Sequence, residues 1–151
     1  MSPVLTARPA LIRDAVPADA AGCAEILADW LEATPWMPKL HSRAETAAFL
    51  DRQIAQAEVI LAVQASSVAG FAILQGACLA ALYTKAPGQG HGRALLDAVK
   101  TRRTDGFYLW CFQANLGAQR FYRREGLCQT RRTEGENAEG LPDIRFAWGL
   151  R

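Results

Sequence analysis

Three glycines at alternate positions, Gly88, Gly90 and Gly92, lie between an apolar run and a helical pattern. A strand that enters glycine-rich backbone and then a helix leaves several N–H groups unpaired at the positive end of the helix dipole. Phosphate suits such a turn because the missing Cβ atoms let an anion approach the backbone. Arg93, in the first helical turn, adds a charged donor. The spacing predicts a phosphate-binding loop, and a plain tight turn is the alternative that this segment leaves open.

Neither of the two best-known phosphate loops fits the segment. A P-loop requires Gly-Lys-Ser/Thr, whereas Gly92 is followed by Arg93 and Ala94. A dinucleotide fingerprint requires G-x-G-x-x-G and an acidic residue at the end of the next strand. Here the glycines are spaced G-x-G-x-G, and Asp105 precedes the next apolar run. The loop therefore belongs to neither class.

The four cysteines show no metal-ligand or redox spacing, because no C-x-x-C pair occurs and no histidine accompanies them. We therefore expect no metal and interpret the cysteines as small buried thiols of a reducing cytoplasm. Cys111 is the one alternative nucleophile. Its strand is wholly apolar and no histidine lies near it in the sequence, so this alternative is the weaker one.

The elements that must position the glycine loop follow from periodicity and turn residues. Helices are predicted at 18–33, 42–57, 92–103 and 115–126. Strands are predicted at 11–16, 59–63, 68–74, 77–84, 107–112 and 127–132, followed by a last strand on which Ile144, Phe146, Trp148 and Leu150 point one way. Ser42 with Glu45 has the capping-box pattern, Asn115 is a good N-cap, and Gly126 is a good residue to end a helix.

This order, β-α-α-β-β-β-α-β-α-β-β, combines hairpins with β-α-β crossovers. It predicts an α/β (α+β) fold with a mixed, mostly antiparallel sheet of about seven strands and helices on both faces. The 151 residues suit a single domain spanning 1–151. The net charge of +2 is too small to favour nucleic acid, and no apolar run is long enough for a membrane span or a signal peptide. We therefore expect a cytoplasmic protein without a nucleic-acid or membrane partner.

Several groups of residues together match one known family. They are Leu82-Tyr83-Thr84, the loop Gly88-Gln89-Gly90-His91-Gly92-Arg93-Ala94-Leu95-Leu96, Asn115 with Phe121-Tyr122 and Gly126, and the opening Ile12-Arg13-Asp14-Ala15 with Asp19. On these residues and on the element order, the chain resembles the GNAT superfamily of N-acetyltransferases over nearly its whole length.

The resemblance implies that acetyl-CoA binds as co-substrate in a V-shaped opening between strands 77–84 and 107–112. Backbone groups of Leu82, Tyr83 and Thr84 would pair with the pantetheine arm like an added strand. The loop amides would hold the pyrophosphate, and Asn115 would cap its helix and touch the cofactor. The loop residues concerned are Gly88, Gln89, Gly90, His91, Gly92 and Arg93. Two positions depart from the family: Pro87 stands where Gln or Arg is usual, and His91 takes an apolar position.

The implied reaction is direct attack of a primary amine on the thioester, without an acyl-enzyme. Tyr122, two helical turns after Asn115, would then be the general acid that protonates the leaving thiolate. Phenol and thiol reference pKa values differ by roughly 1.5 units, so this proton transfer is only mildly uphill. From the residues alone, packing of Tyr122 beside Phe121 is an equal alternative. A backbone N–H near Leu82 or Tyr83 would polarise the thioester carbonyl.

The base and the acceptor are less well marked. Relatives often carry an acidic residue where Ala80 stands, and no Asp or Glu occurs between Glu58 and Asp97. The candidates for a base elsewhere are His41, Glu32, Glu134 and Glu136. We expect the segments 30–41 and 133–143 to form the acceptor site, with Trp36 and Met37 offering apolar contact or filling the core.

The expected acceptor is the primary amine of a small molecule or peptide, and a homodimer is left open. The alternative function is a catalytically weak CoA-binding sensor or scaffold with the same fold, which Pro87 and the missing strand carboxylate favour. Thiol release from acetyl-CoA across a panel of amines distinguishes the two functions.

Overall fold

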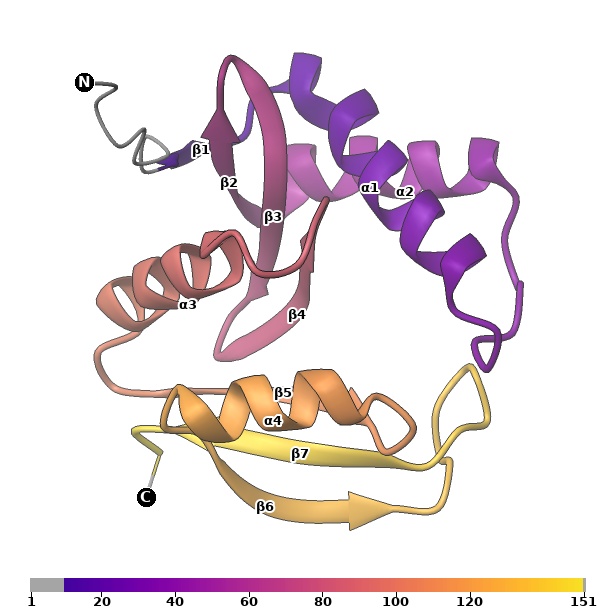
Figure 1. Ribbon diagram of the computed structural model, residues 1–151, viewed down its shortest axis with the longest axis vertical. Coiled ribbons are helices and arrows are strands. Elements are labelled where there is room, and N and C mark those ends of the chain that lie inside the picture. Colours follow the sequence, from indigo (N-terminus) through magenta and orange to yellow (C-terminus); the bar gives the residue numbers. More distant parts are fainter. Residues whose placement is uncertain (1–9, 151) are drawn as a thin grey trace, which may run out of the picture.

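The computed structural model describes residues 10–150 of the chain, and one seven-stranded sheet forms its centre (Figure 1). The strands lie in the order β1-β2-β3-β4-β5-β7-β6. Their bounds are β1 Leu11–Asp14, β2 Glu58–Gln64, β3 Ser67–Gln75, β4 Cys78–Thr84, β5 Phe107–Phe112, β6 Cys128–Thr133 and β7 Asp143–Trp148. Only β4 and β5 pair in parallel, which confirms the mixed, mostly antiparallel sheet. Residues 1–9, where the sequence predicts no signal peptide, and residue 151 lie outside the described part.

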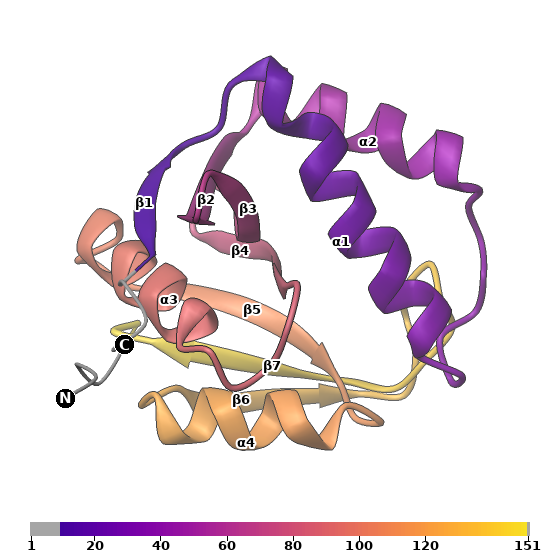
Figure 2. The same ribbon diagram turned by 45° about the horizontal axis from the view of Figure 1, so that its top comes forward.

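The helices divide into two pairs that cover opposite faces of the sheet (Figure 2). They are α1 Ala20–Ala33, α2 Arg43–Gln56, α3 His91–Arg102 and α4 Leu116–Arg124, and a short 3-10 turn spans Pro17–Asp19. The predicted element order is thereby confirmed. None of the helices in the described residues has the length and apolar composition that crossing a membrane requires.

Alternation along the strands fills two separate cores. Ile60 of β2 and Ala72 of β3 join the core beneath α3, whereas their neighbours Leu61 and Phe71 join the core beneath α1 and α2. Successive side chains of a strand point to opposite faces, so a continuous apolar run is what a doubly covered strand needs. The apolar run of the central strand β4 has the same cause.

Strands β4 and β5 touch at one end and then part. Their only residue pair is Cys78 with Tyr108, and the Tyr108 N–H donates to the carbonyl of Ala77 at 2.9 Å. On the other side of β4, Ile73 pairs with Ala81 and Leu74 with Leu79, so Ala80 is an extra residue. Such a bulge bends its strand and increases the local twist. The two halves of the sheet therefore diverge toward the C-terminal ends of β4 and β5 (Figure 1).

The helix ends near this opening follow their sequence signals. The Ser42 hydroxyl accepts from the Glu45 amide at 3.1 Å, and the Glu45 carboxylate accepts from the Ser42 amide at 3.0 Å. The Asn115 side chain accepts from the Ala118 amide at 3.1 Å and so caps α4. Gly126 follows α4 with φ of +92°, a conformation that glycine adopts without strain.

Three expectations from the sequence are wrong in detail. The first strand ends at Asp14 instead of Val16, because the chain turns into the 3-10 turn that begins at Pro17. The last strand ends at Trp148, and Leu150 is 39% exposed instead of aligned with the buried Ile144. Cys128 is exposed, whereas Cys23 and Cys111 are buried as expected.

Candidate functional site

The glycine loop presents unpaired backbone donors at the start of α3. Gly88 and Gly90 have φ of +75° and +79°, and Gly90 is the N-cap of the helix. No heavy atom lies within 4 Å of the position that a Cβ would take on either glycine. Within the described chain, no backbone or side-chain acceptor receives the amides of residues 88–93, and the first helical bond runs from Ala94 to the Gly90 carbonyl at 3.0 Å. The amides therefore face open space at the positive end of a helix, as an anion site requires.

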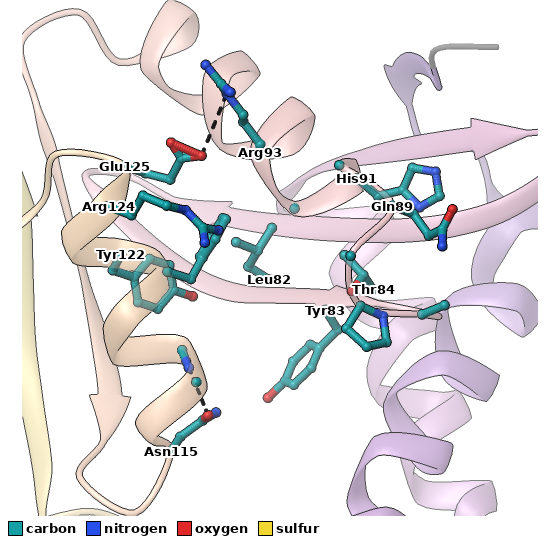
Figure 3. A pocket seen from close by; sticks show the side chains of 18 of the residues that line it. Leu82, Tyr83, Thr84, Gln89, His91, Arg93, Asn115, Tyr122, Arg124 and Glu125 are labelled. Carbon is teal, nitrogen blue, oxygen red and sulfur yellow. Dashed lines mark hydrogen bonds and ion pairs between the residues drawn. The ribbon is translucent and has the colours of Figure 1, made fainter. Parts of the chain in front are cut away.

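A cavity of about 860 Å³ opens beside this loop (Figure 3). It lies between the end of β4, the loop and α4. Its lining includes every residue for which the sequence predicts a cofactor or catalytic role: Leu82, Tyr83, Thr84, Gly88, Gln89, Gly90, His91, Gly92, Arg93, Asn115 and Tyr122. Residues from three separate elements thus surround one space. The sequence predicts no cofactor contact for the other lining residues, notably Trp30, Phe121 and Arg124.

Two arginines and one glutamate line this cavity, so its charged side chains leave a net positive charge. Arg93 is 72% exposed and lies 3.7 Å from the carboxylate of Glu125, a contact that joins α3 to α4 (Figure 3). The Arg124 guanidinium lies over the Phe121 ring, 5.6 Å from its centroid. With the free amides, these groups fit a diphosphate such as that of acetyl-CoA.

His91 is buried at the first position of α3, with 6% of its surface exposed. Neither ring nitrogen has a hydrogen-bond partner. Leaving a buried polar atom unpaired costs free energy, so the position favours an apolar side chain in the empty protein. Its amide, by contrast, belongs to the row of donors in the loop.

The Tyr122 phenol points from α4 into the space between that helix and β4 (Figure 3). The ring packs against Phe121 at 5.3 Å and Phe146 at 5.9 Å between centroids, so it is also part of the core. Burial raises the pKa of Tyr122 far above its usual range, and nearby Cys111 and Tyr83 raise it further. The phenol therefore carries its proton at neutral pH.

A small cavity of about 110 Å³ fills the split between β4 and β5. It is lined by residues 79–83 of β4, residues 109–112 of β5, and by Trp30, Asn115, Ala118 and Tyr122. Tyr122 and Asn115 line both this cavity and the large one. The split and the space beside the glycine loop are therefore neighbours that share part of their walls.

A third cavity, of about 450 Å³, lies on the opposite side of the split. Trp30, Met37 and His41 come from one segment for which the sequence predicts an acceptor site, and Glu139 comes from the other. Met37 is buried, while Trp36 packs beneath the wall instead of lining it. Leu31 also belongs to the first of these segments. The remaining lining residues come from α1, α2, β4 and the end of β5, and the sequence predicts an acceptor role for none of them: Leu27, Glu45, Thr46, Ala48, Phe49, Arg52, Ala80, Ala81, Tyr83 and Phe112.

The candidates for a base differ in their positions. His41 lines this third cavity but is 65% exposed and lies 3.7 Å from Glu45. Glu32 is bound to Arg43 at 2.8 Å, outside the three cavities, and neither Glu134 nor Glu136 lines any of them. Burial raises the pKa of Cys111 to about 11, which keeps it a thiol and opposes a nucleophilic role. No group of metal-ligating side chains occurs within residues 10–150.

Solved structures with the same fold are numerous. YjaB from Escherichia coli, in its apo form, superposes with a TM-score of 0.75 at 22% identity and covers 93% of this chain and 98% of its own. A GNAT-family acetyltransferase from Bacillus cereus gives 0.75 at 15% identity, with 93% and 97% covered. YncA from Salmonella typhimurium, solved with its cofactor acetyl-CoA, gives 0.72 at 20% identity, with 94% of each chain covered. No protein-family model and no curated protein matches the sequence.

The chain therefore has the fold of the GNAT acetyltransferases, as its sequence predicts.

Proposed function

We propose that the protein is an N-acetyltransferase that moves an acetyl group from acetyl-CoA to a primary amine. One observation carries the proposal: a loop of unpaired amides and a split between two strands border neighbouring cavities, and Tyr122 lines both of them. If the loop were only a tight turn and Tyr122 only a packing residue, the two would not need to lie beside neighbouring cavities. The fold shared with acetyltransferases supports the same reaction class.

The chain's residues have distinct tasks in this proposal. The amides of residues 88–93 hold the pyrophosphate, and the free edge of β4 at Leu82, Tyr83 and Thr84 pairs with the pantetheine arm. These contacts direct the thioester into the split, where Tyr122 lies. Asn115 holds the start of α4 and lines the cofactor cavity.

The transfer forms an N–C bond and breaks the C–S bond. The amine loses a proton to solvent or a base, and the thiolate gains one from Tyr122. The raised pKa of Tyr122 makes proton donation to a solvated thiolate more uphill than the reference values suggest. A thiolate formed in the same buried split is also desolvated, which raises the pKa of its thiol. The pKa values of the Tyr122 phenol and the leaving thiol are thereby brought closer together.

The test combines binding and turnover with acetyl-CoA and a panel of primary amines. We expect thiol release to depend on both substrates, and Tyr122→Phe to lower kcat by about 100-fold with CoA affinity unchanged, the size usual for a general acid. Tyr108→Phe is the matched control, because Tyr108 is a partly buried tyrosine of β5 that lines none of the three cavities. Binding of CoA without thiol release on any amine would favour the sensor instead. Equal losses in the two variants would contradict the role of Tyr122.

A further inference from the structure

The third cavity and the split share two aromatic side chains in their walls. Trp30 of α1 and Tyr83 of β4 line all three cavities. Their ring centroids lie 5.1 Å apart. A molecule in the 450 Å³ cavity therefore lies next to the split, with these two rings at the boundary.

Aromatic rings form a fixed wall of this third cavity. Trp30, Tyr83 and Phe112 line it. Trp36 supports the wall from behind, because it packs edge-on against Trp30 at 5.9 Å and against Phe112 at 5.8 Å between centroids. Rings held by one another keep their faces in place, and such faces attract flat apolar groups and cations.

Glu139 brings a carboxylate to the same cavity. It is partly buried, and no side chain or backbone group of residues 10–150 forms a hydrogen bond or ion pair with it. Its charge acts on the wall, because it adds to the burial that raises the pKa of Tyr83 to about 12. A partly buried carboxylate without a partner beside aromatic faces suits a cation.

The loop that carries Glu139 is held in place by its own contacts. The Asn137 amide group donates to the Leu141 carbonyl at 2.7 Å and to the Asp143 carboxylate at 3.1 Å. The Thr133 hydroxyl donates to the same carboxylate. These bonds tie the loop to the ends of β6 and β7, so Glu139 is presented from a fixed support.

The other charged groups of the cavity are engaged or solvated. Glu45 accepts from the Ser42 amide at 3.0 Å and lies 3.7 Å from His41, which is itself 65% exposed. Arg52 is exposed on α2, where water screens its charge. Of the charged residues that line the cavity, Glu139 is therefore the one whose charge is both sheltered and uncompensated.

This inference rests on the proposed N-acetyltransferase function and names its acceptor. We propose that the acceptor is a primary arylalkylamine, with its flat ring on the wall of Trp30, Tyr83 and Phe112 and its ammonium group beside Glu139. Pockets of a few hundred Å³ are of the size that binds small molecules. A substrate with a carboxylate next to the amine is disfavoured, because it would place a second negative charge near Glu139.

Calorimetric titration of the whole chain in the presence of CoA tests the ligand class without requiring turnover. The probes are 2-phenylethylamine, butylamine, which lacks the ring, and phenylalanine, which adds the carboxylate. We expect 2-phenylethylamine to bind at least about tenfold more tightly than either of the others. Equal or tighter binding of butylamine or phenylalanine overturns the inference.

Charge variants in one loop test the role of Glu139. We expect Glu139→Gln to weaken 2-phenylethylamine binding about tenfold and Glu139→Asp to restore part of the loss, with CoA affinity unchanged in both. Glu136→Gln is the matched control, since Glu136 lies in the same loop, is exposed and lines none of the three cavities. Equal effects of the glutamine variants at 139 and 136 overturn the assignment.

Thiol release with the same amines separates this inference from the function on which it rests. Turnover of butylamine or phenylalanine as fast as 2-phenylethylamine overturns the acceptor class and leaves the transferase standing. Selective binding of 2-phenylethylamine without thiol release on any amine overturns the transferase and leaves the amine site standing.

Discussion

The two large cavities on either side of the split are lined by groups of different chemical character. The one beside the glycine loop offers backbone amides and the guanidinium groups of Arg93 and Arg124, whereas the one beneath α1 and α2 offers aromatic faces and one sheltered carboxylate. Backbone N–H groups are present in any chain that forms this turn, so they can bind the same ligand in many proteins. A cavity wall made of side chains depends on the sequence, so it can select a particular ligand. In the proposed function, acetyl-CoA occupies the first cavity and the amine the second, and Trp30 and Tyr83 line both.

Loss of the amide cradle has the largest expected effect. Gly90→Val forces a branched side chain into a backbone with φ of +79°, in the open space that an anion would occupy. We expect CoA affinity to fall about 50-fold in a titration, since charge-assisted bonds to several amides are lost.

Gly76→Val is the matched control for this variant. Gly76 has φ of +58°, nothing within 4 Å of its Cβ position, and a turn that lines none of the three cavities. Gly76→Val introduces similar backbone strain. A comparable loss of CoA affinity in this control would therefore contradict the proposed binding of CoA by the amides of residues 88–93.

Alkaline titration sharpens the account of the acceptor side. The pKa of Tyr83 is about 12 in the folded state against an ordinary value of 10, because of burial and the charge of Glu139. A folded pKa above the unfolded one stabilises the protein below pH 10, and this contribution is lost as the pH rises from 10 through about 12.

We expect the free energy of unfolding to fall by about 2 kcal/mol from this group over that window, measured by urea unfolding at a series of pH values. Tyr83→Phe should make that part of the profile less steep, with the remaining slope coming from Tyr122 and the buried cysteines, whose pKa values are also raised. Glu139→Gln should narrow the window by lowering the Tyr83 pKa. A profile that neither substitution alters would show that Glu139 and Tyr83 are not coupled.

Removal of the support behind the aromatic wall should affect one cavity only. Trp36→Leu deletes the ring that holds Trp30 and Phe112, so we expect 2-phenylethylamine affinity to fall about fivefold. CoA affinity, measured on the same sample, should stay within the error of the titration. A larger loss of affinity for CoA than for the amine would contradict the assignment of the two ligands to separate cavities.

The smallest expected effect is a gain of stability on the cofactor side. His91→Leu replaces a buried imidazole that has no partner by an apolar side chain of similar size. We expect the free energy of unfolding to rise by about 1 kcal/mol in urea titrations. CoA affinity should change less than about threefold, because the proposed donor at this position is the amide. A fall in the free energy of unfolding would show that the His91 ring stabilises the fold.

The cavity beside the glycine loop could be predicted from the sequence because its parts are local. The end of β4, the glycine loop and the start of α3 occupy one continuous segment, 82–93, and glycine spacing reports backbone conformation directly. The cap at Asn115 is equally local, since the bond joins residues three apart. The fold follows from the same kind of signal, because periodicity and turn residues act over short stretches.

The acceptor side is hidden from such reasoning for two physical reasons. Its wall joins α1, α2, β4, β5 and the β6–β7 loop. The sequence predicts the segment 133–143 but not which of its acids lines the cavity, because no local rule tells that Glu139 does so and that Glu134 and Glu136 do not. The bulge at Ala80 adds a residue to β4, which changes the faces that the following side chains occupy. The sequence therefore predicts a backbone role for Tyr83 but gives no sign that its ring lies at the junction.

A crystal structure of the protein with acetyl-CoA tests the central claim most directly. The account predicts the pyrophosphate within hydrogen-bonding distance of the amides of residues 88–93, and the thioester sulfur beside the Tyr122 hydroxyl in the split between β4 and β5. A cofactor bound elsewhere, or one whose sulfur lies away from Tyr122, would contradict it.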